Sequence, residues 1–359
     1  MYFFVRTLSR SLSLTTMIID AHGHYTTVPA GLRVFRALQI SQMGKPVKSA
    51  LQISDDEIRA SLERGQIRLL NERGTDVMLF SPMASAMGHH FGNALISRHW
   101  TEVNNELIRR VCALYPDRFI GVCALPQSPG VSPRESVEEL KRCVNEFGFV
   151  GRNMNPDPSG GFWTDPPLGS EWWYPLYEAL ESLDVPAMIH ASATCNPAFH
   201  TTGSHYLNTD ATAFLQLMGS RVFDDFPRLR FVMPHGGGNV PYQSARYRAL
   251  AILNKWEPFE TFVKRFYFDT TVYSPDAMDM LVKVVGVDNI VFASEMLGGV
   301  NAVDPQTGRS FDDNKPCLDV IPWLADGDRK KIFEENVKKA YPRVGPILER
   351  RVKVADAGV

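Results

Sequence analysis

The chain has 359 residues, 44% hydrophobic and 22% charged, so it is long enough for one large domain with a sizeable buried core. Its 38 basic and 40 acidic residues give a formal charge of −2, which argues against nucleic acid or a membrane surface as a partner. No apolar run approaches the roughly 18 residues needed to cross a bilayer. We therefore expect a soluble protein without a membrane segment.

The first 16 residues differ in composition from the rest of the chain. They contain Arg6, Arg10 and several serines but no acidic residue, as transit peptides do. An extended start upstream of Met17 explains them equally well. The cysteines form no CxxC pair, which favours a reducing compartment. We expect a cytoplasmic protein, or a mitochondrial one if residues 1–16 are a transit peptide, with one domain over residues 17–345 and a C-terminal tail over residues 346–359.

From Met17 onward, short apolar segments alternate with longer amphipathic ones. Many of the short segments are continuous apolar runs, which is typical of strands buried on both faces of a parallel sheet. Eight of them are predicted to be strands: residues 18–24, 75–81, 119–125, 149–155, 186–191, 229–235, 266–271 and 289–295.

Helices are predicted between these strands. Ser54 and Glu57 form a capping-box pattern that opens an amphipathic run ending at Glu72. Further helices are predicted over residues 98–115, 133–147, 172–183, 211–221, 241–253, 275–285 and 328–340. Eight strand–helix pairs in a chain of this length favour an α/β fold of the (β/α)8 TIM-barrel type over an open doubly wound sheet.

Histidines and one carboxylate stand at the ends of several predicted strands. His22 and His24 close the first strand, His190 the fifth, His235 the sixth and Glu295 the eighth. In a (β/α)8 barrel the carboxyl ends of the strands meet at one mouth, where active sites lie. Because side chains alternate along a strand, His22 and His24 point to the same side.

Each of these residues has an ordinary structural explanation when it is taken alone. An HxH pair is a weak signal, a lone histidine at a strand end is more often a hydrogen-bonded core residue, and Glu295 could pair with an arginine. Buried imidazoles and a carboxylate at this density are costly without a metal or partners. The pattern favours one divalent metal ion, and Zn²⁺ with an open coordination position suits these ligands, although manganese fits them too.

Residues that could contact a small anion are less distinctive. Asn155 ends the fourth predicted strand and could supply amide hydrogen bonds to a ligand, or only a turn. Arg152, Arg246 and Arg248 are candidates for clamping a carboxylate. Each arginine alone is more often a surface or salt-bridge residue.

Four segments carry a resemblance to a known family: IDAHGH at 19–24, MIH at 188–190, PHGGG at 234–238 and ASEM at 293–296. On these segments the chain resembles the amidohydrolase superfamily, in the branch of aminocarboxymuconate-semialdehyde decarboxylase-like enzymes, from about Met17 to Arg343. That branch commonly ends strand eight with Ser-Asp. Glu295 at this position is similar to the members that hydrate 4-oxalomesaconate, as are the segments HY at 24–25, FSP at 80–82, LPQSP at 125–129 and NPDP at 155–158.

The resemblance implies a metal-dependent lyase that adds water to the conjugated double bond of 4-oxalomesaconate in protocatechuate- or gallate-type aromatic degradation. The metal ligands it implies are His22, His24, His190 and Glu295. His235 or Glu295 could act as general acid or base. Because a carboxylate cannot easily be a tight metal ligand and a proton shuttle at once, the role of Glu295 stays open. The carboxylates of a small polycarboxylate substrate would be held by Tyr206, Asn155 and Arg246. Barrels of this branch are often dimers or larger, so a homo-oligomer is expected.

Met83 departs from the family's pattern, which has an arginine after Phe-Ser-Pro. Losing one charge-assisted hydrogen bond costs roughly 1.5–3 kcal/mol, and this leaves the exact substrate open. A nonoxidative decarboxylase of an aromatic or muconate-type acid would use the same metal ligands. A metal-dependent hydrolase of a lactone or amide and a catalytically inert scaffold are further alternatives, and the scaffold would purify without stoichiometric metal.

Overall fold

The computed structural model of the protein describes residues 16–42 and 51–356, so the expectation for residues 1–16 lies almost wholly outside the described residues. Its centre is a sheet of eight parallel strands that follow one another in chain order, each hydrogen-bonded to the next. The strands are β1 (Ile19–His24), β2 (Val77–Ser81), β3 (Phe119–Cys123), β4 (Gly151–Met154), β5 (Ala187–Ile189), β6 (Phe231–Met233), β7 (Phe266–Asp269) and β8 (Ile290–Val291). All eight predicted strands are present, and each is shorter than predicted.

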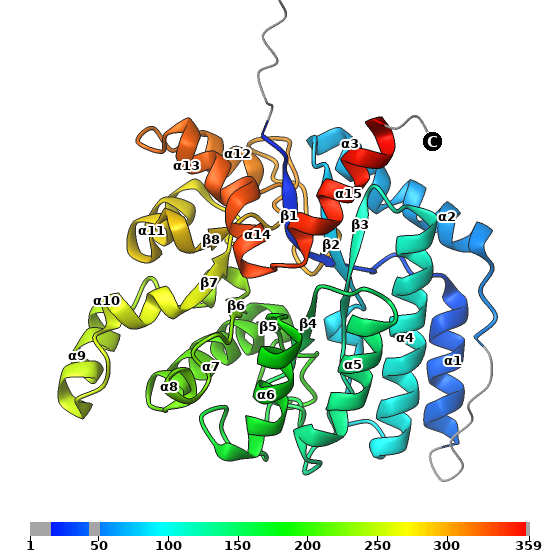
Figure 1. Ribbon diagram of the computed structural model, residues 1–359, viewed down its shortest axis with the longest axis horizontal. Helices are drawn as coiled ribbons and strands as arrows, with labels where there is room; N and C mark the ends of the chain where they lie inside the picture. Colours follow the sequence, from blue (N-terminus) through cyan, green and yellow to red (C-terminus); the bar gives the residue numbers. More distant parts are fainter. Residues whose placement is uncertain (1–15, 43–50, 357–359) are drawn as a thin grey trace, which may run out of the picture.

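Backbone hydrogen bonds close this sheet into a barrel. The Ala21 N–H donates to the carbonyl of Phe292 at 2.8 Å, and the Glu295 N–H donates to the carbonyl of His22 at 3.0 Å, which joins β1 to the segment after β8. Helices surround the strands on the outside (Figure 1). The predicted (β/α)8 barrel is therefore confirmed.

Fifteen α-helices lie in the described part of the chain. They are α1 (Ala30–Ser41), α2 (Asp55–Arg64), α3 (Gln66–Arg73), α4 (Ala94–Leu114), α5 (Val137–Asn145), α6 (Tyr174–Leu183), α7 (Tyr206–Met218), α8 (Val222–Asp225), α9 (Ser244–Asn254), α10 (Phe259–Phe262), α11 (Pro275–Val285), α12 (Lys315–Asp319), α13 (Asp326–Lys330), α14 (Asn336–Ala340) and α15 (Val344–Asp356). Within residues 16–42 and 51–356, no helix has both the length and the apolar character to cross a membrane.

The barrel interior is filled by branched apolar side chains, as the packing of such barrels requires. They form one buried cluster that includes Ile19, Val77, Leu79, Ile120, Val122, Val150, Val232 and Val291. The same cluster includes Tyr341, Val344 and Leu348, and Arg351 donates to the carbonyl of Phe119 at the start of β3. Helix α15 therefore covers the amino-terminal end of the barrel, and residues 346–356 of the expected tail belong to it.

The helices differ from the prediction in three places that bear on the site. The predicted helix over residues 54–72 breaks into α2 and α3 at Gly65, where a Cβ would lie 2.7 Å from the Thr27 methyl group. Helix α1 was not predicted. Helix α7 begins at Tyr206, five residues before the predicted start, and so carries Tyr206 and Asp210 on its buried face. The other end of the barrel, at the carboxyl ends of the strands, holds the candidate site.

Candidate metal centre

A bulge in β1 turns both histidines of the HxH pair toward the barrel axis. The pairing of β1 with β2 shifts by one residue between Asp20 and Gly23. Ala21 packs in the interior cluster, so regular alternation would next turn Gly23 inward rather than the histidines. The extra residue reverses the alternation, and His22 and His24 join the central group of side chains.

Four side chains from three parts of the barrel meet at this end. His22 and His24 end β1, His190 follows β5 and Glu295 follows β8, and one ligand atom from each lies within 4.8 Å of all the others. The Nε2 atom of His24 lies 2.9 Å from that of His22 and 3.3 Å from that of His190. The Glu295 Oε1 atom lies 3.9 Å from His24 Nε2 and 3.8 Å from His190 Nε2. All four candidate ligands are thus brought together.

Hydrogen bonds on the far side of each imidazole fix which nitrogen faces the centre. His22 Nδ1 lies 2.7 Å from Asp269 Oδ2 and His190 Nδ1 lies 2.8 Å from the Ala191 carbonyl, and because both partners only accept, Nδ1 carries the proton. His24 Nδ1 lies 2.7 Å from the Ser81 hydroxyl. The Nε2 lone pairs therefore face one another, an arrangement that a cation between them stabilises. The donor set fits a divalent metal ion.

The charge states of these groups agree with a metal site. Burial lowers the pKa of His24 well below its ordinary value and that of His190 to about 4, so both imidazoles are neutral at pH 7. Burial alone would raise the pKa of the Glu295 carboxyl, but the neighbouring His190, His22 and His235 hold it well below its usual range. Neutral imidazoles and an ionised carboxylate are the forms that bind a metal.

A cavity of about 360 Å³ lies beside the candidate ligands, and of these four residues only Glu295 lines it. His235, Tyr206 and Glu295 line this cavity together with Tyr273, whose hydroxyl donates to Glu295 Oε2 at 3.2 Å. The Tyr206 ring stacks on His235 with centroids 5.4 Å apart and planes at 8°. Both predicted catalytic residues and one predicted substrate-binding residue therefore share one cavity.

His235 is held by a buried carboxylate. Its Nδ1 lies 2.9 Å from Asp210 Oδ2, while its Nε2 is buried, has no hydrogen-bond partner among the described residues and lies 3.8 Å from Glu295 Oε2. Burial alone would lower the pKa of His235, but the charge of Asp210 raises it to about 9. His235 and Glu295 both have left-handed backbone conformations, with φ of 51° and 49°. Such strain in non-glycine residues is concentrated at functional sites.

The remaining predicted binding residues lie in different places. Asn155 lines a narrow pocket beside His190 and donates to the Ser192 hydroxyl at 3.1 Å. Arg152 is fully buried and donates to Gln127 Oε1 at 3.3 Å. Arg246 and Arg248 are exposed on α9, away from the residues that line the 360 Å³ cavity, and Arg248 pairs with Glu260 at 2.5 Å.

Three residues of the site were not predicted. Asp269 ends β7, and a carboxylate at a strand end was a signal available in the sequence. Asp210 lies within α7, and Tyr273 lies in the loop after β7 with φ of 60°. No sequence motif marks Asp210 or Tyr273. Their contacts with His235 and Glu295 arise only when the folded chain brings these segments to the mouth of the barrel.

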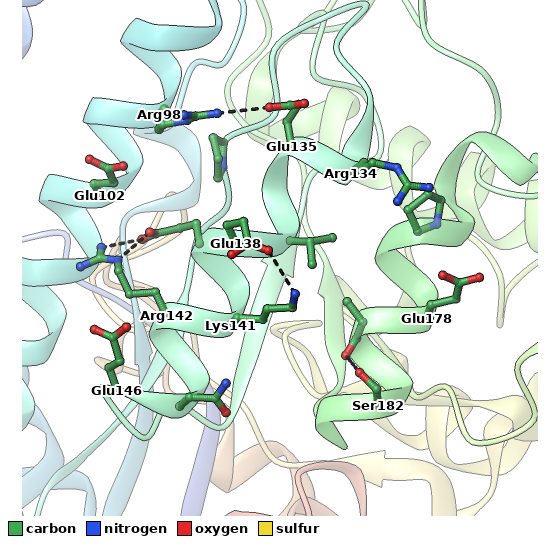
Figure 2. Close-up of a pocket in the computed structure, with 16 residues that line it drawn as sticks. Arg98, Glu102, Arg134, Glu135, Glu138, Lys141, Arg142, Glu146, Glu178 and Ser182 are labelled. Carbon is green, nitrogen blue, oxygen red and sulfur yellow. Dashed lines mark hydrogen bonds and ion pairs between the residues drawn. The ribbon is translucent and has the colours of Figure 1, made fainter.

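A larger cavity of about 960 Å³ lies on the outside of the barrel and contains none of these residues (Figure 2). It runs between α4, α5 and α6, and charged side chains line it. Arg98 pairs with Glu135 at 3.2 Å, and Lys141 pairs with Glu138 at 3.1 Å. Because neighbouring charges of opposite sign neutralise one another here, we assign no function to this groove.

A (β/α)8 barrel with three imidazoles and a carboxylate at the carboxyl ends of its strands is the arrangement of a metal-dependent barrel enzyme. The chain belongs to the amidohydrolase family, whose sequence pattern matches residues 19–343. The predicted family membership is confirmed.

Known proteins similar to this chain include hydratases and decarboxylases. The chain is 47% identical over 338 residues to the 2-keto-4-carboxy-3-hexenedioate hydratase of Sphingobium sp. (strain SYK-6), covering 93% of this chain and 99% of that protein. The crystal structure of 4-oxalomesaconate hydratase from Rhodopseudomonas palustris matches with a TM-score of 0.87 and 45% identity, over 94% of this chain and 100% of that one. A gamma-resorcylate decarboxylase of Polaromonas sp. (strain JS666) is 28% identical over 64% of this chain and 75% of its own length.

Proposed function

We propose that the protein is a metal-dependent hydratase, a carbon–oxygen lyase that adds water to the conjugated double bond of 4-oxalomesaconate. One observation carries the proposal: Glu295 and His235 face a single cavity beside the metal ligands, so a base and an acid can act on the same bound molecule. The similarity to hydratases over nearly the full length supports this reading over a decarboxylase.

Addition of water requires the hydroxyl group to bond to one alkene carbon and a proton to bond to the other. A bound divalent ion would supply a Lewis-acid centre that activates water at neutral pH. Glu295 Oε2 accepts the proton that the water loses. His235 Nε2 delivers a proton to the carbon next to the ketone, and Asp210 stabilises the imidazolium before transfer. The product, 4-carboxy-4-hydroxy-2-oxoadipate, contains one water more than the substrate.

The separation of the two groups allows the site to reset. Glu295 Oε2 and His235 Nε2 lie 3.8 Å apart, so the proton gained by Glu295 can return to His235 after a small movement of either side chain. Tyr273 donates to the same carboxylate oxygen and orients it. The reaction therefore needs no further proton carrier.

The substrate carboxylates are proposed to contact Tyr206 from the cavity wall and Asn155 from the pocket beside His190. Arg246, which is exposed on α9, remains a proposed binding residue whose contribution a substitution must test. We propose Zn²⁺ as the metal because three imidazoles and one carboxylate suit it, with manganese as the alternative. A cytoplasmic homo-oligomer, dimeric or larger, is proposed as the working form.

The proposal is tested by incubating the purified metal-loaded protein with 4-oxalomesaconate. We expect loss of the ultraviolet absorbance of the conjugated system, a product heavier by one water, and loss of activity when a chelator removes the metal. Metal content measured beforehand identifies zinc or manganese. Release of carbon dioxide from this or a related acid would instead support the decarboxylase, and an intact substrate with a fully metallated protein would overturn the hydratase.

A further inference from the structure

A pocket of about 310 Å³ lies outside the metal centre, between α1, α4 and the loop after β2. Helix α1 runs beside α4 on the outside of the barrel (Figure 1). The lining is mostly apolar and includes Tyr25, Leu32, Met83, Trp100 and Leu107, with Arg36 as one of its cations. None of the four metal ligands lines it. We call this the α1–α4 pocket.

The Arg36 guanidinium is held at this pocket by groups that do not neutralise it. It stacks on the Trp100 ring at 4.7 Å, and its Nη2 atom donates to the carbonyl of Gly88 at 3.0 Å. Its Nη1 atom is buried and has no hydrogen-bond partner in the described part of the chain. Buried donors are almost always satisfied in folded proteins, so the unsatisfied Nη1 leaves part of the guanidinium without an acceptor from the protein.

No acidic side chain among residues 16–42 and 51–353 compensates the charge of Arg36. Among residues 16–42 and 51–353 no carboxylate lies within ion-pair distance of it, and residues 1–15 and 43–50 contain no Asp or Glu. Burial lowers the pKa of Arg36 to about 10, which still leaves it a cation at pH 7. A half-buried cation without a counter-charge favours an anionic ligand.

We propose that the α1–α4 pocket binds a small carboxylic acid with an apolar body. Its carboxylate would accept hydrogen bonds from the guanidinium of Arg36, and its apolar part would pack on Trp100, Leu32 and Leu107. The site is separate from the metal centre and does not depend on the proposed hydratase activity. A pocket of this size, with apolar walls and one fixed polar group, is typical of small-molecule sites.

Trp100 offers a direct readout, because its ring forms part of the wall. Benzoate is titrated into the metal-loaded protein while tryptophan emission is followed, with neutral benzamide as the comparison. We expect a saturable change with benzoate that Trp100→Phe abolishes. Arg36→Met loses the charge-assisted contact, so we expect it to bind benzoate about tenfold or more weakly than the unaltered protein does. The unaltered protein should bind neutral benzamide about tenfold or more weakly than benzoate, for the same reason. Arg68→Met, at an exposed position of α3, should bind benzoate as the unaltered protein does.

A second pair of variants tests the pocket without changing Arg36, which also hydrogen-bonds to the carbonyl of Gly88 in the loop after β2. Met83→Glu places a carboxylate in the pocket and should block benzoate, while Met83→Gln, of nearly the same size, should retain binding. Equal binding in Arg36→Met and the unaltered protein would overturn the proposal. So would equal binding of benzamide, a signal that survives in Trp100→Phe, or no saturable change at all.

Discussion

The Nδ1 atom of His235 lies 2.9 Å from Oδ2 of Asp210, and both side chains are buried beside the metal centre. The carboxylate fixes the ring so that Nε2 faces the cavity shared with Glu295. The contact joins α7 to the turn after β6, two elements whose proximity no local pattern indicates. His235 is not part of the group of candidate ligands, and the contact suits the role of proton donor that we propose for it.

Asp210→Asn tests this relationship. The asparagine has nearly the same shape but no charge to stabilise the imidazolium, so we expect kcat to fall by about 10²-fold or more, the usual contribution of a positioned acid or base. Steady-state rates are compared at equal metal content. Asp224→Asn, at an exposed position of α8, is the matched control and should leave kcat unchanged. Full activity in Asp210→Asn would exclude a role for the pair.

His24→Ala tests the metal centre itself. Removing this ligand leaves two imidazoles and one carboxylate, so we expect the purified protein to hold little metal and to show no measurable hydration. Elemental analysis and activity are measured on the same sample. His200→Asn changes an exposed histidine that is not one of the four candidate ligands and should keep its metal. Stoichiometric metal in His24→Ala would show that the ligand set is different.

Asp269→Asn tests whether the hydrogen bond from His22 to Asp269 strengthens metal binding. The Asp269 carboxylate accepts the Nδ1 proton of His22 at 2.7 Å and also accepts the backbone N–H of Gly236 at 3.1 Å. Replacing such an outer partner typically costs about 10- to 100-fold in metal affinity. Competition with a chelator of known affinity measures the change. Metal binding as tight as in the unaltered protein would assign Asp269 to stability alone, which a thermal unfolding midpoint would register.

Much of the barrel and of its metal ligands could be predicted because both depend on local pattern. Continuous apolar runs identified the strands, and chemistry at the strand ends identified His22, His24, His190 and Glu295, which the fold then gathers by its own geometry. The same reasoning placed His235 at the site. In each case the prediction depended on the place of the residue at the end of a predicted strand.

What could not be predicted depends on contacts between distant segments. Asp210 is one of several acidic residues on helices, and only the return of α7 to the barrel mouth brings it to His235. Tyr273 reaches Glu295 from a loop. Arg246 was predicted to bind a carboxylate because of its charge, yet it is exposed on α9 in the single chain. The bulge in β1 is a further example, because alternation predicts that two histidines share a face but not which face.

Gly23 ties that bulge to the metal centre, and Gly23→Ala tests the connection. A Cβ at this position would lie 2.3 Å from Met78 Sδ and 2.9 Å from the carbonyl of Leu79, and the backbone carbonyl cannot move without disturbing β2. Overpacking of this kind costs about 1–3 kcal/mol. Because the bulge aims His22 and His24, we expect both a lower free energy of unfolding and weaker metal binding. Gly327→Ala, where nothing lies within 4 Å of the added carbon, is the control. A stability loss with unchanged metal affinity would show that the bulge does not determine the orientation of the two histidines.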